Sequence, residues 1–159
     1  MKISVWGNEL SAWVARAQLA SYGNTVFLES GETEPVSSQL RSEPGLLAAL
    51  QNAALHERLS VDSDAALNAE VHWLSMAPDE SDAALELIER IAKNCKGPLL
   101  VVNQSNFGVG MCDRMQALLQ GELQQVVYLP DLLQAGQAMQ QFVNPEALLI
   151  GTDNPTAKA

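Results

Sequence analysis

The sequence predicts a doubly wound α/β domain, with a mostly parallel sheet of about six strands and helices on both faces. Short apolar runs alternate with segments of helical period, the pattern of repeated βα units. The runs are short and mostly apolar, as in the strands of a parallel sheet that is covered on both faces. Because 159 residues with 47% hydrophobic content can bury one core, we expect one domain over residues 1–151 and a frayed tail over residues 152–159.

Strands are expected where apolar residues run together, and helices where leucine, alanine and methionine recur at three- and four-residue spacing. The apolar runs are ISVW (3–6), TVFL (25–28), LSV (59–61), VHWLSM (71–76), PLLVV (98–102), QVVYL (125–129) and ALLIG (147–151). The helical segments are 10–23, 43–55, 81–97 and 109–122. Gly23 and Gly97 each follow an expected helix, where a residue with positive φ is favoured. The polar segment 30–42 is expected to be a loop.

The charge balance excludes several classes of partner. Nineteen acidic residues against nine basic ones give a net charge of −10, so neither nucleic acid nor an anionic membrane is an expected partner. Cys95 and Cys112 form no CxxC pair, and no histidine is spaced with a second ligand, so no metal site is expected. The sequence shows neither a signal peptide nor a long apolar span, and we expect a cytoplasmic protein.

The turn after the first expected strand is the strongest candidate for a binding site. A strand, a glycine turn, a helix and a second strand form the context in which a GxGxxG fingerprint indicates a Rossmann-like dinucleotide site. The six residues in that register are Gly7, Asn8, Glu9, Leu10, Ser11 and Ala12. The first glycine is present, and alanine at the sixth position still permits close packing of helix and strand.

Glu9 departs from this fingerprint, because the backbone at its position must approach a pyrophosphate. A side chain obstructs that approach, and a carboxylate opposes the field of the helix N-terminus for anions. Two like charges about 4 Å apart cost about 1 kcal/mol in water and about 4 kcal/mol at an effective dielectric near 20. The acidic residue that binds a ribose would fall at Ser30, with Glu29 one place early. We therefore expect no high-affinity cofactor, and NAD only if the site is retained.

A resemblance to a known family extends over almost the whole chain. The segments KISVWG (2–7), SEPGLLAAL (42–50), 58–78, IAKNCKGPLLVVNQSNFGVG (91–110) and 129–153 follow in order. Together they resemble the N-terminal domain of the UDP-glucose/GDP-mannose dehydrogenases. The resemblance implies NAD-dependent oxidation of a sugar-nucleotide alcohol to a carboxylate, with a catalytic cysteine on a later domain, and a link to polysaccharide biosynthesis.

The functional positions of that family are mostly altered in this chain. The resemblance places Asn106 where the family has a threonine beside the cofactor, and Asp131 where it has a glutamate that assists the chemistry. Ala77 and Pro78 lead almost directly into the next helix, which shortens a wall over the cofactor. Scaffold residues persist and polar ones are lost, so we expect no catalytic residue, with Asn106 and Asp131 as altered equivalents.

The remaining chemistry-bearing side chains are expected to be structural. Cys95 and Cys112 lie in helical patterns without a histidine that could form a thiolate, so we expect buried or half-buried structural thiols. His56 closes an apolar helix and His72 lies in an apolar strand. The two remaining candidates, Trp6 and Trp13, are expected in the core, and Lys93 and Lys96 are favourable charges at a helix C-terminus.

Three hypotheses about function remain open. The first is a stand-alone, catalytically inactive relative of the nucleotide-sugar dehydrogenases that acts as a binding, regulatory or interaction module, with another protein chain or itself as partner. The second is a weak nucleotide binder, or the NAD-binding portion of a UDP-glucose 6-dehydrogenase-like oxidoreductase completed by another chain. The third is that the chain is a piece of a longer enzyme. The loss of polar motifs within the chain itself argues against this hypothesis. An open groove at residues 7–12 would favour the second hypothesis.

Overall fold

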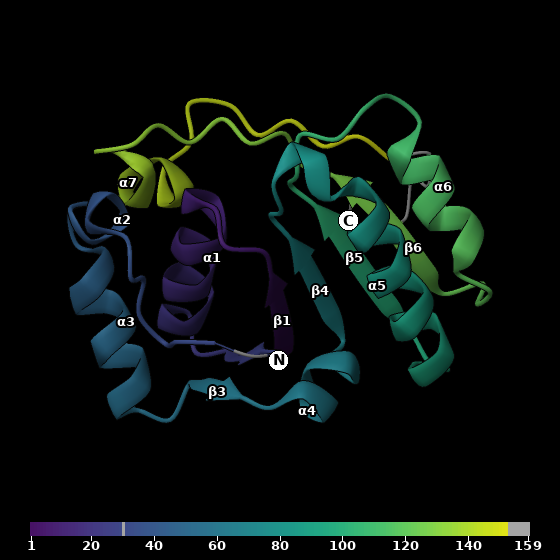
Figure 1. Ribbon diagram of the computed structural model, residues 1–159, viewed down its shortest axis with the longest axis horizontal. Helices are drawn as coiled ribbons and strands as arrows, with labels where there is room; N and C mark the ends of the chain where they lie inside the picture. The colour runs from purple at the N-terminus through teal and green to yellow at the C-terminus, as the bar shows by residue number, and fades with distance from the viewer. Residues whose placement is uncertain (30, 153–159) are drawn as a thin grey trace.

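The sheet has six parallel strands in the order β3-β2-β1-β4-β5-β6, as expected for a doubly wound domain (Figure 1). The computed structural model describes residues 1–29 and 31–152. The strands are β1 (Lys2–Trp6), β2 (Thr25–Leu28), β3 (Leu59–Val61), β4 (Val71–Leu74), β5 (Leu99–Asn103) and β6 (Gln124–Tyr128). The strand order reverses between β1 and β4, and the crevice of such a sheet lies at the carboxyl ends of these two strands.

Helices cover both faces of the sheet (Figure 1). They are α1 (Leu10–Ser21), α2 (Ser38–Arg41), α3 (Leu46–Leu55), α4 (Ser63–Leu67), the 3₁₀ helix η1 (Pro78–Glu80), α5 (Ser81–Asn94), α6 (Met111–Leu118) and α7 (Ala138–Val143). Helix α1 packs against α3 and α7 on one face, and α5 packs against α6 and α4 on the other. No helix among the described residues is long and apolar enough to cross a membrane.

Several local expectations are confirmed by the fold. Six of the seven apolar runs form the strands, and Gly23 follows α1 with a φ of +89°. Trp6 and Trp13 are buried in the core, and His56 forms the C-cap of α3.

Other local expectations are wrong. The run ALLIG (147–151) forms no strand among the described residues. Only Gly151 pairs, in an isolated antiparallel bridge with Tyr128, and Leu148 is 64% exposed. Helix α5 ends at Asn94 with an extended C-cap at Cys95, so Gly97 lies beyond the position where positive φ is needed. The expected loop contains α2, and the short helices α4 and α7 were also not expected, because so few residues show little periodicity. The expected frayed tail begins at residue 152, and residues 153–159 lie outside the described part.

Gly7 is fixed by the close approach of two chain segments. It has a φ of +105°, and a Cβ built there would lie 1.8 Å from the carbonyl oxygen of Ser75, directly after β4. The end of β1 therefore passes against the backbone that leaves β4. Only glycine allows this approach, which explains the first glycine of the turn.

The last described segment returns across the carboxyl edge of the sheet. Residues 129–137 run from β6 to α7, beside α1, and residues 144–152 return toward β6 (Figure 1). The buried carboxylate of Glu43 accepts hydrogen bonds from the backbone N–H groups of Gly136 and Met139. The rings of Trp73 and Phe142 lie 5.7 Å apart. Glu43 thus holds α7 against the first half of the domain.

Candidate functional site

Two hollows lie along the crevice at the carboxyl ends of β1, β4 and β5. The first hollow, of about 430 Å³, lies between the turn after β1 and the loop after β2. The second hollow, of about 250 Å³, lies between the N-terminus of α1 and the ends of β4 and β5. The first hollow is lined by residues that include Gly7, Asn8, Trp13, Arg16, Glu29, Glu32 and Glu34. The second hollow is lined by Glu9, Leu10, Ser11, Ser75, Met76, Pro78, Gln104, Ser105, Asn106, Asp131 and Leu133.

The turn places Glu9 at the N-cap of α1. Its backbone is extended, with φ −73° and ψ 170°, and its exposed side chain makes no capping hydrogen bond to the helix. Ser11 is buried and its hydroxyl shares a hydrogen bond with the hydroxyl of Ser75. Ala12 is fully buried, so the helix and the sheet pack closely there. The carboxylate therefore stands at the helix end where a pyrophosphate would bind.

A buried arginine, Arg16, holds the turn after β1 through a hydrogen bond. Sequence reasoning did not identify this residue as part of the site. Arg16 donates from Nη2 to the carbonyl oxygen of Gly7 at 2.6 Å, and its guanidinium lies 4.2 Å from the centre of the Trp13 ring. Burial lowers the pKa of Arg16 to about 10, so the side chain remains charged at neutral pH. Among the described residues, Arg16 Nε and Trp13 Nε1 have no hydrogen-bond partner. The only sequence feature that points to this buried position is an arginine within an apolar helix.

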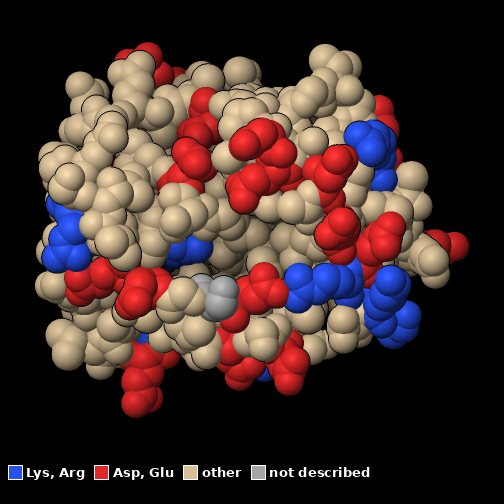
Figure 2. Space-filling view, in the orientation of Figure 1, with Lys and Arg blue, Asp and Glu red and all other residues tan. Residues whose placement is uncertain are grey.

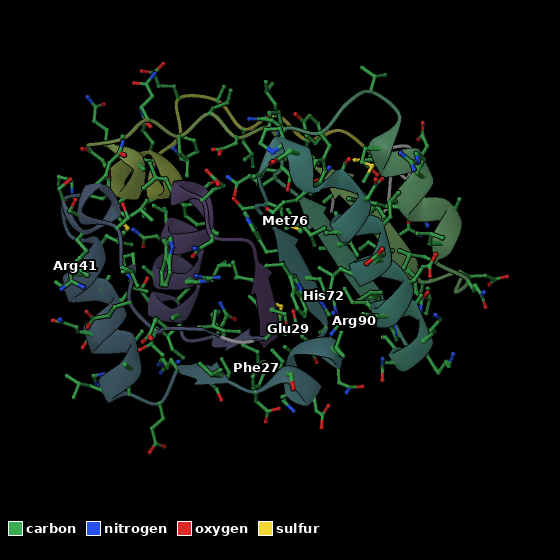
Figure 3. The ribbon with its side chains drawn as sticks, viewed as in Figure 1. Phe27, Glu29, Arg41, His72, Met76 and Arg90 are labelled. Carbon is green, nitrogen blue, oxygen red and sulfur yellow. The ribbon has the colours of Figure 1, made fainter. Side chains whose placement is uncertain are left out.

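The walls of the first hollow are acidic. Glu29, Glu32 and Glu34 all line it. Figure 2, in the orientation of Figure 1, shows acidic side chains across the middle of the molecule. The carboxylate of Glu29 forms an ion pair with Arg90 of α5, toward which it points in Figure 3. Both side chains are partly exposed, so this pair adds little stability. Ser30, the other candidate for a ribose contact, lies outside the described residues.

The sequence candidates divide between the two hollows. Gly7, Asn8 and Glu29 line the first, and Glu9, Leu10, Ser11, Pro78, Asn106 and Asp131 line the second. Ala12 and Ala77 line neither, because Ala12 packs in the core and the N–H of Ala77 donates to Glu80 of η1. The fold thus brings Asn106 and Asp131, which are far apart in sequence, to the same hollow as Glu9.

Buried polar residues at the ends of β4 and β5 form the floor of the second hollow. Trp73 Nε1 donates to Gln104 Oε1 at 2.7 Å, and the N–H of Met76 donates to Ser105 Oγ at 2.9 Å. Asn103 Oδ1 accepts from the N–H of Ser105 at 3.1 Å. These bonds fix the side chains that face the hollow. Gln104 is 4% exposed, and nothing in its local sequence indicated that it would be buried.

The thiol and imidazole groups outside the hollows have structural surroundings. Burial raises the pKa of Cys112, although a hydrogen bond from Asn103 partly offsets this effect. Burial lowers the pKa of His72 to about 4, and its Nδ1 accepts from Trp6 Nε1 at 3.1 Å. The described residues contain no group of three or more His, Cys, Asp or Glu side chains that could hold a metal ion.

The strand order, the glycine turn and the crevice at the strand-order reversal define a dinucleotide-binding type of α/β domain. The chain belongs to the UDP-glucose/GDP-mannose dehydrogenase family, as its NAD binding domain: the family model matches residues 1–159. This confirms the resemblance seen in the sequence. No curated protein sequence matches the chain at a significant level.

Solved structures of such dehydrogenases share the fold. GDP-mannose dehydrogenase from Pseudomonas aeruginosa matches with a TM-score of 0.80 at 19% identity, over 99% of this chain and 42% of that one. UDP-glucose dehydrogenase from Pyrobaculum islandicum matches with a TM-score of 0.80 at 21% identity, over 99% of this chain and 42% of that one. The chain therefore spans less than half the length of these proteins.

Proposed function

We propose that the chain is a catalytically inactive member of the family that acts as a binding, regulatory or interaction module, with weak affinity for NAD. The observation that carries this proposal is the position of Glu9. Its carboxylate stands at the N-terminus of α1, where the field of the helix would otherwise favour a phosphate. The first hollow leaves room for the adenosine half of a dinucleotide, whereas Glu9 opposes its pyrophosphate.

The altered catalytic positions give this proposal further support. Asn106 is exposed at the rim of the second hollow, and Asp131 is half-buried with Oδ1 accepting from the N–H of Leu133 at 3.2 Å. Among the described residues, no hydrogen bond or ion pair joins either side chain to a base or a nucleophile. Cys112 has a raised pKa, which disfavours the thiolate that a nucleophile requires.

A second candidate function is the NAD-binding portion of an oxidoreductase whose remaining parts another chain or region supplies. The first hollow favours it, because about 430 Å³ remains open where an adenosine would lie. The buried charge of Arg16 beneath Gly7 offsets part of the repulsion from Glu9. The two candidates therefore differ in whether the turn accepts a pyrophosphate.

Calorimetric titration of NAD into the native chain and two Glu9 variants distinguishes these candidates. We expect negligible heat for the native chain, detectable binding for Glu9→Gly, and an intermediate result for Glu9→Gln, which removes the charge and keeps the size. Glu122→Gly, in an exposed turn outside both hollows, is the matched control for losing one charge. A micromolar dissociation constant for the native chain would refute weak binding and favour the second candidate.

An activity assay tests inactivity separately. We expect no reduction of NAD in the presence of UDP-glucose or GDP-mannose, because neither hollow holds a nucleophile with its base. Turnover above a protein-free blank that Asp131→Ala abolishes would contradict this expectation and show that the second hollow catalyses the reaction.

A further inference from the structure

The first hollow is lined by residues whose polar groups lack partners in the protein. In the part of the chain that the structure describes, three buried side-chain atoms have no hydrogen-bond partner. Two of them, Trp13 Nε1 and Arg16 Nε, belong to residues that line this hollow. Both side chains are more than nine-tenths buried. Because an unpaired buried donor is costly, these groups point to an acceptor that the protein itself does not supply.

Arg16 is the donor best placed for a ligand. It donates only from Nη2, to the carbonyl oxygen of Gly7, and forms no ion pair among the described residues. Nη1 also lacks a hydrogen-bond partner there but, unlike Nε, is not sealed from solvent, so it remains open to the hollow that Arg16 lines. The hollow therefore contains a fixed guanidinium, a group with several donors and no acceptor.

One acceptor on the wall of the same hollow is also free. Glu29 and Glu34 line the hollow, but ion pairs within the protein hold both of them. Glu32 is exposed, and no hydrogen bond or ion pair joins its carboxylate to another described residue. A ligand that satisfies both Arg16 and Glu32 must carry acceptors as well as donors.

The lining also has an apolar part. Val36 lines the hollow although it is 83% exposed, and Leu40 beside it is half-buried. A ligand that covers these side chains removes apolar surface from water, which favours binding. A flat ring with polar edges meets all of these conditions, because its faces contact apolar side chains while its edges form hydrogen bonds.

We propose that the first hollow binds the guanine base of a nucleoside, with Arg16 donating to O6 and N7 and Glu32 accepting from N1–H and the 2-amino group. Guanine presents O6 and N7 as neighbouring acceptors, which arginine contacts in a bidentate manner. Its N1–H and amino group are neighbouring donors, for which a carboxylate is a strong acceptor. The volume of about 430 Å³ lies within the roughly 300–1,000 Å³ typical of small-molecule sites.

Other ligands match this pair of residues less well. Adenine carries an amino group where guanine has O6, so a donor would face the donors of Arg16. A phosphate would accept from Arg16 but would meet the like charge of Glu32. A simple cation would leave Arg16 without an acceptor.

This inference rests on the proposed function, because it names the ligand of a binding module. It adds a preference for one base to the weak affinity for NAD. Guanosine carries no phosphate, so its binding does not require the turn at Glu9 to accept one. The two titrations therefore fail separately: micromolar binding of NAD would refute the weak affinity, whereas the base preference is decided by guanosine against adenosine.

The test is an NMR titration of the ¹⁵N-labelled chain with guanosine, with adenosine, inosine and uridine as matched nucleosides. The indole N–H signals of Trp6 and Trp13 report on the first hollow, and that of Trp73, which lines neither hollow, is the internal reference. We expect guanosine to shift the Trp13 signal with saturation. Adenosine should bind about tenfold or more weakly, because a bidentate arginine contact distinguishes bases by such a factor. Inosine, which lacks only the 2-amino group, should bind with an affinity between the two.

Variants locate the two edges of the base. Arg16→Lys keeps the positive charge but loses the planar fork, so the affinity for guanosine should fall about tenfold while that for adenosine changes little. Glu32→Ala should weaken guanosine binding about fivefold, as expected for a lost hydrogen bond. Glu122→Ala, which removes an exposed carboxylate outside both hollows, should bind guanosine like the native chain.

If Arg16→Lys does not give a native-like spectrum, Glu32→Ala, at an exposed position, carries the test in its place. A Trp13 signal that does not change up to the solubility limit of guanosine would overturn the proposal. Equal affinities for guanosine and adenosine would also overturn it. Uridine binding as tightly as guanosine would do the same, because it would identify a site for any base with a carbonyl group.

Discussion

Gly7→Ala tests whether the close approach of β1 and β4 determines the shape of the crevice. An alanine Cβ would lie 1.8 Å from the carbonyl oxygen of Ser75, 2.4 Å from its carbonyl carbon and 2.9 Å from the backbone nitrogen of Met76. All three atoms belong to the backbone, so no side-chain rotation relieves the contact. The turn after β1 or the chain leaving β4 must move.

The magnitude follows from two separate effects. A residue with a Cβ at positive φ costs about 1–2 kcal/mol, and forcing extra volume into a packed region costs about 1–3 kcal/mol. Together they predict a loss of about 2–5 kcal/mol, a large part of the roughly 5–15 kcal/mol that stabilises a domain. Gly45→Ala is the matched control, because Gly45 has a φ of +80° and no atom within 4 Å of its added Cβ.

Urea unfolding, followed by tryptophan fluorescence, measures both variants against the native chain. We expect Gly45→Ala to lose only the backbone contribution, and Gly7→Ala to lose about 1–3 kcal/mol more, with a similar dependence on urea. Equal losses of unfolding free energy for the two variants would show that the backbone near Ser75 moves at little cost. That result would refute the argument that the contact between Gly7 and Ser75 is rigid.

Three further predictions concern buried groups. The folded protein holds His72 neutral, with a pKa of about 4 against an ordinary 6.5, whereas the unfolded chain takes up the proton below about 6.5. Stability should therefore fall by about 3 kcal/mol as the pH drops from 6.5 to 4, and His72→Gln should flatten this dependence in urea unfolding at several pH values. Glu43→Ala should lower the free energy of unfolding by about 2–4 kcal/mol, because the N–H groups of Gly136 and Met139 lose a buried carboxylate. Trp73 fluorescence should also change as α7, which carries Phe142, loosens. An unaltered emission spectrum would contradict the role of Glu43 in holding α7. Cys112 should react with a thiol reagent more slowly in the native protein than in urea, and equal rates would argue against its burial.

The sequence predicted the elements that depend on local periodicity. The six strands and the four longer helices were predicted because each carries enough apolar residues to show its period. The run at 147–151 was misread because an apolar stretch at the edge of a sheet resembles a buried strand. Among the described residues of this run only Gly151 pairs with β6, and no local pattern encodes how far such pairing extends.

The candidate site was only partly predictable for the same reason. Gly7 and Glu9 were found because their spacing follows a fingerprint within one turn. The Glu29–Arg90 pair joins residues 61 apart in sequence, and Gln104 meets Trp73 from a neighbouring strand. Arg16 was missed because its burial depends on Trp13 and Gly7, whose side chain and carbonyl face it only after the turn has folded.

The hydrogen bonds from Gly136 and Met139 to Glu43 also bear on the order in which the domain forms. They join groups 93 and 96 residues apart in sequence, so they can close only after the sheet has brought both segments to one edge. Contacts of such separation form late in folding, because the entropy of closing a long loop must be overcome first. We expect these contacts to open before the sheet unfolds, because local units at the edge of a domain are often less stable than its central strands. We therefore expect helix α7 to dock late, and its release would uncover one side of α1.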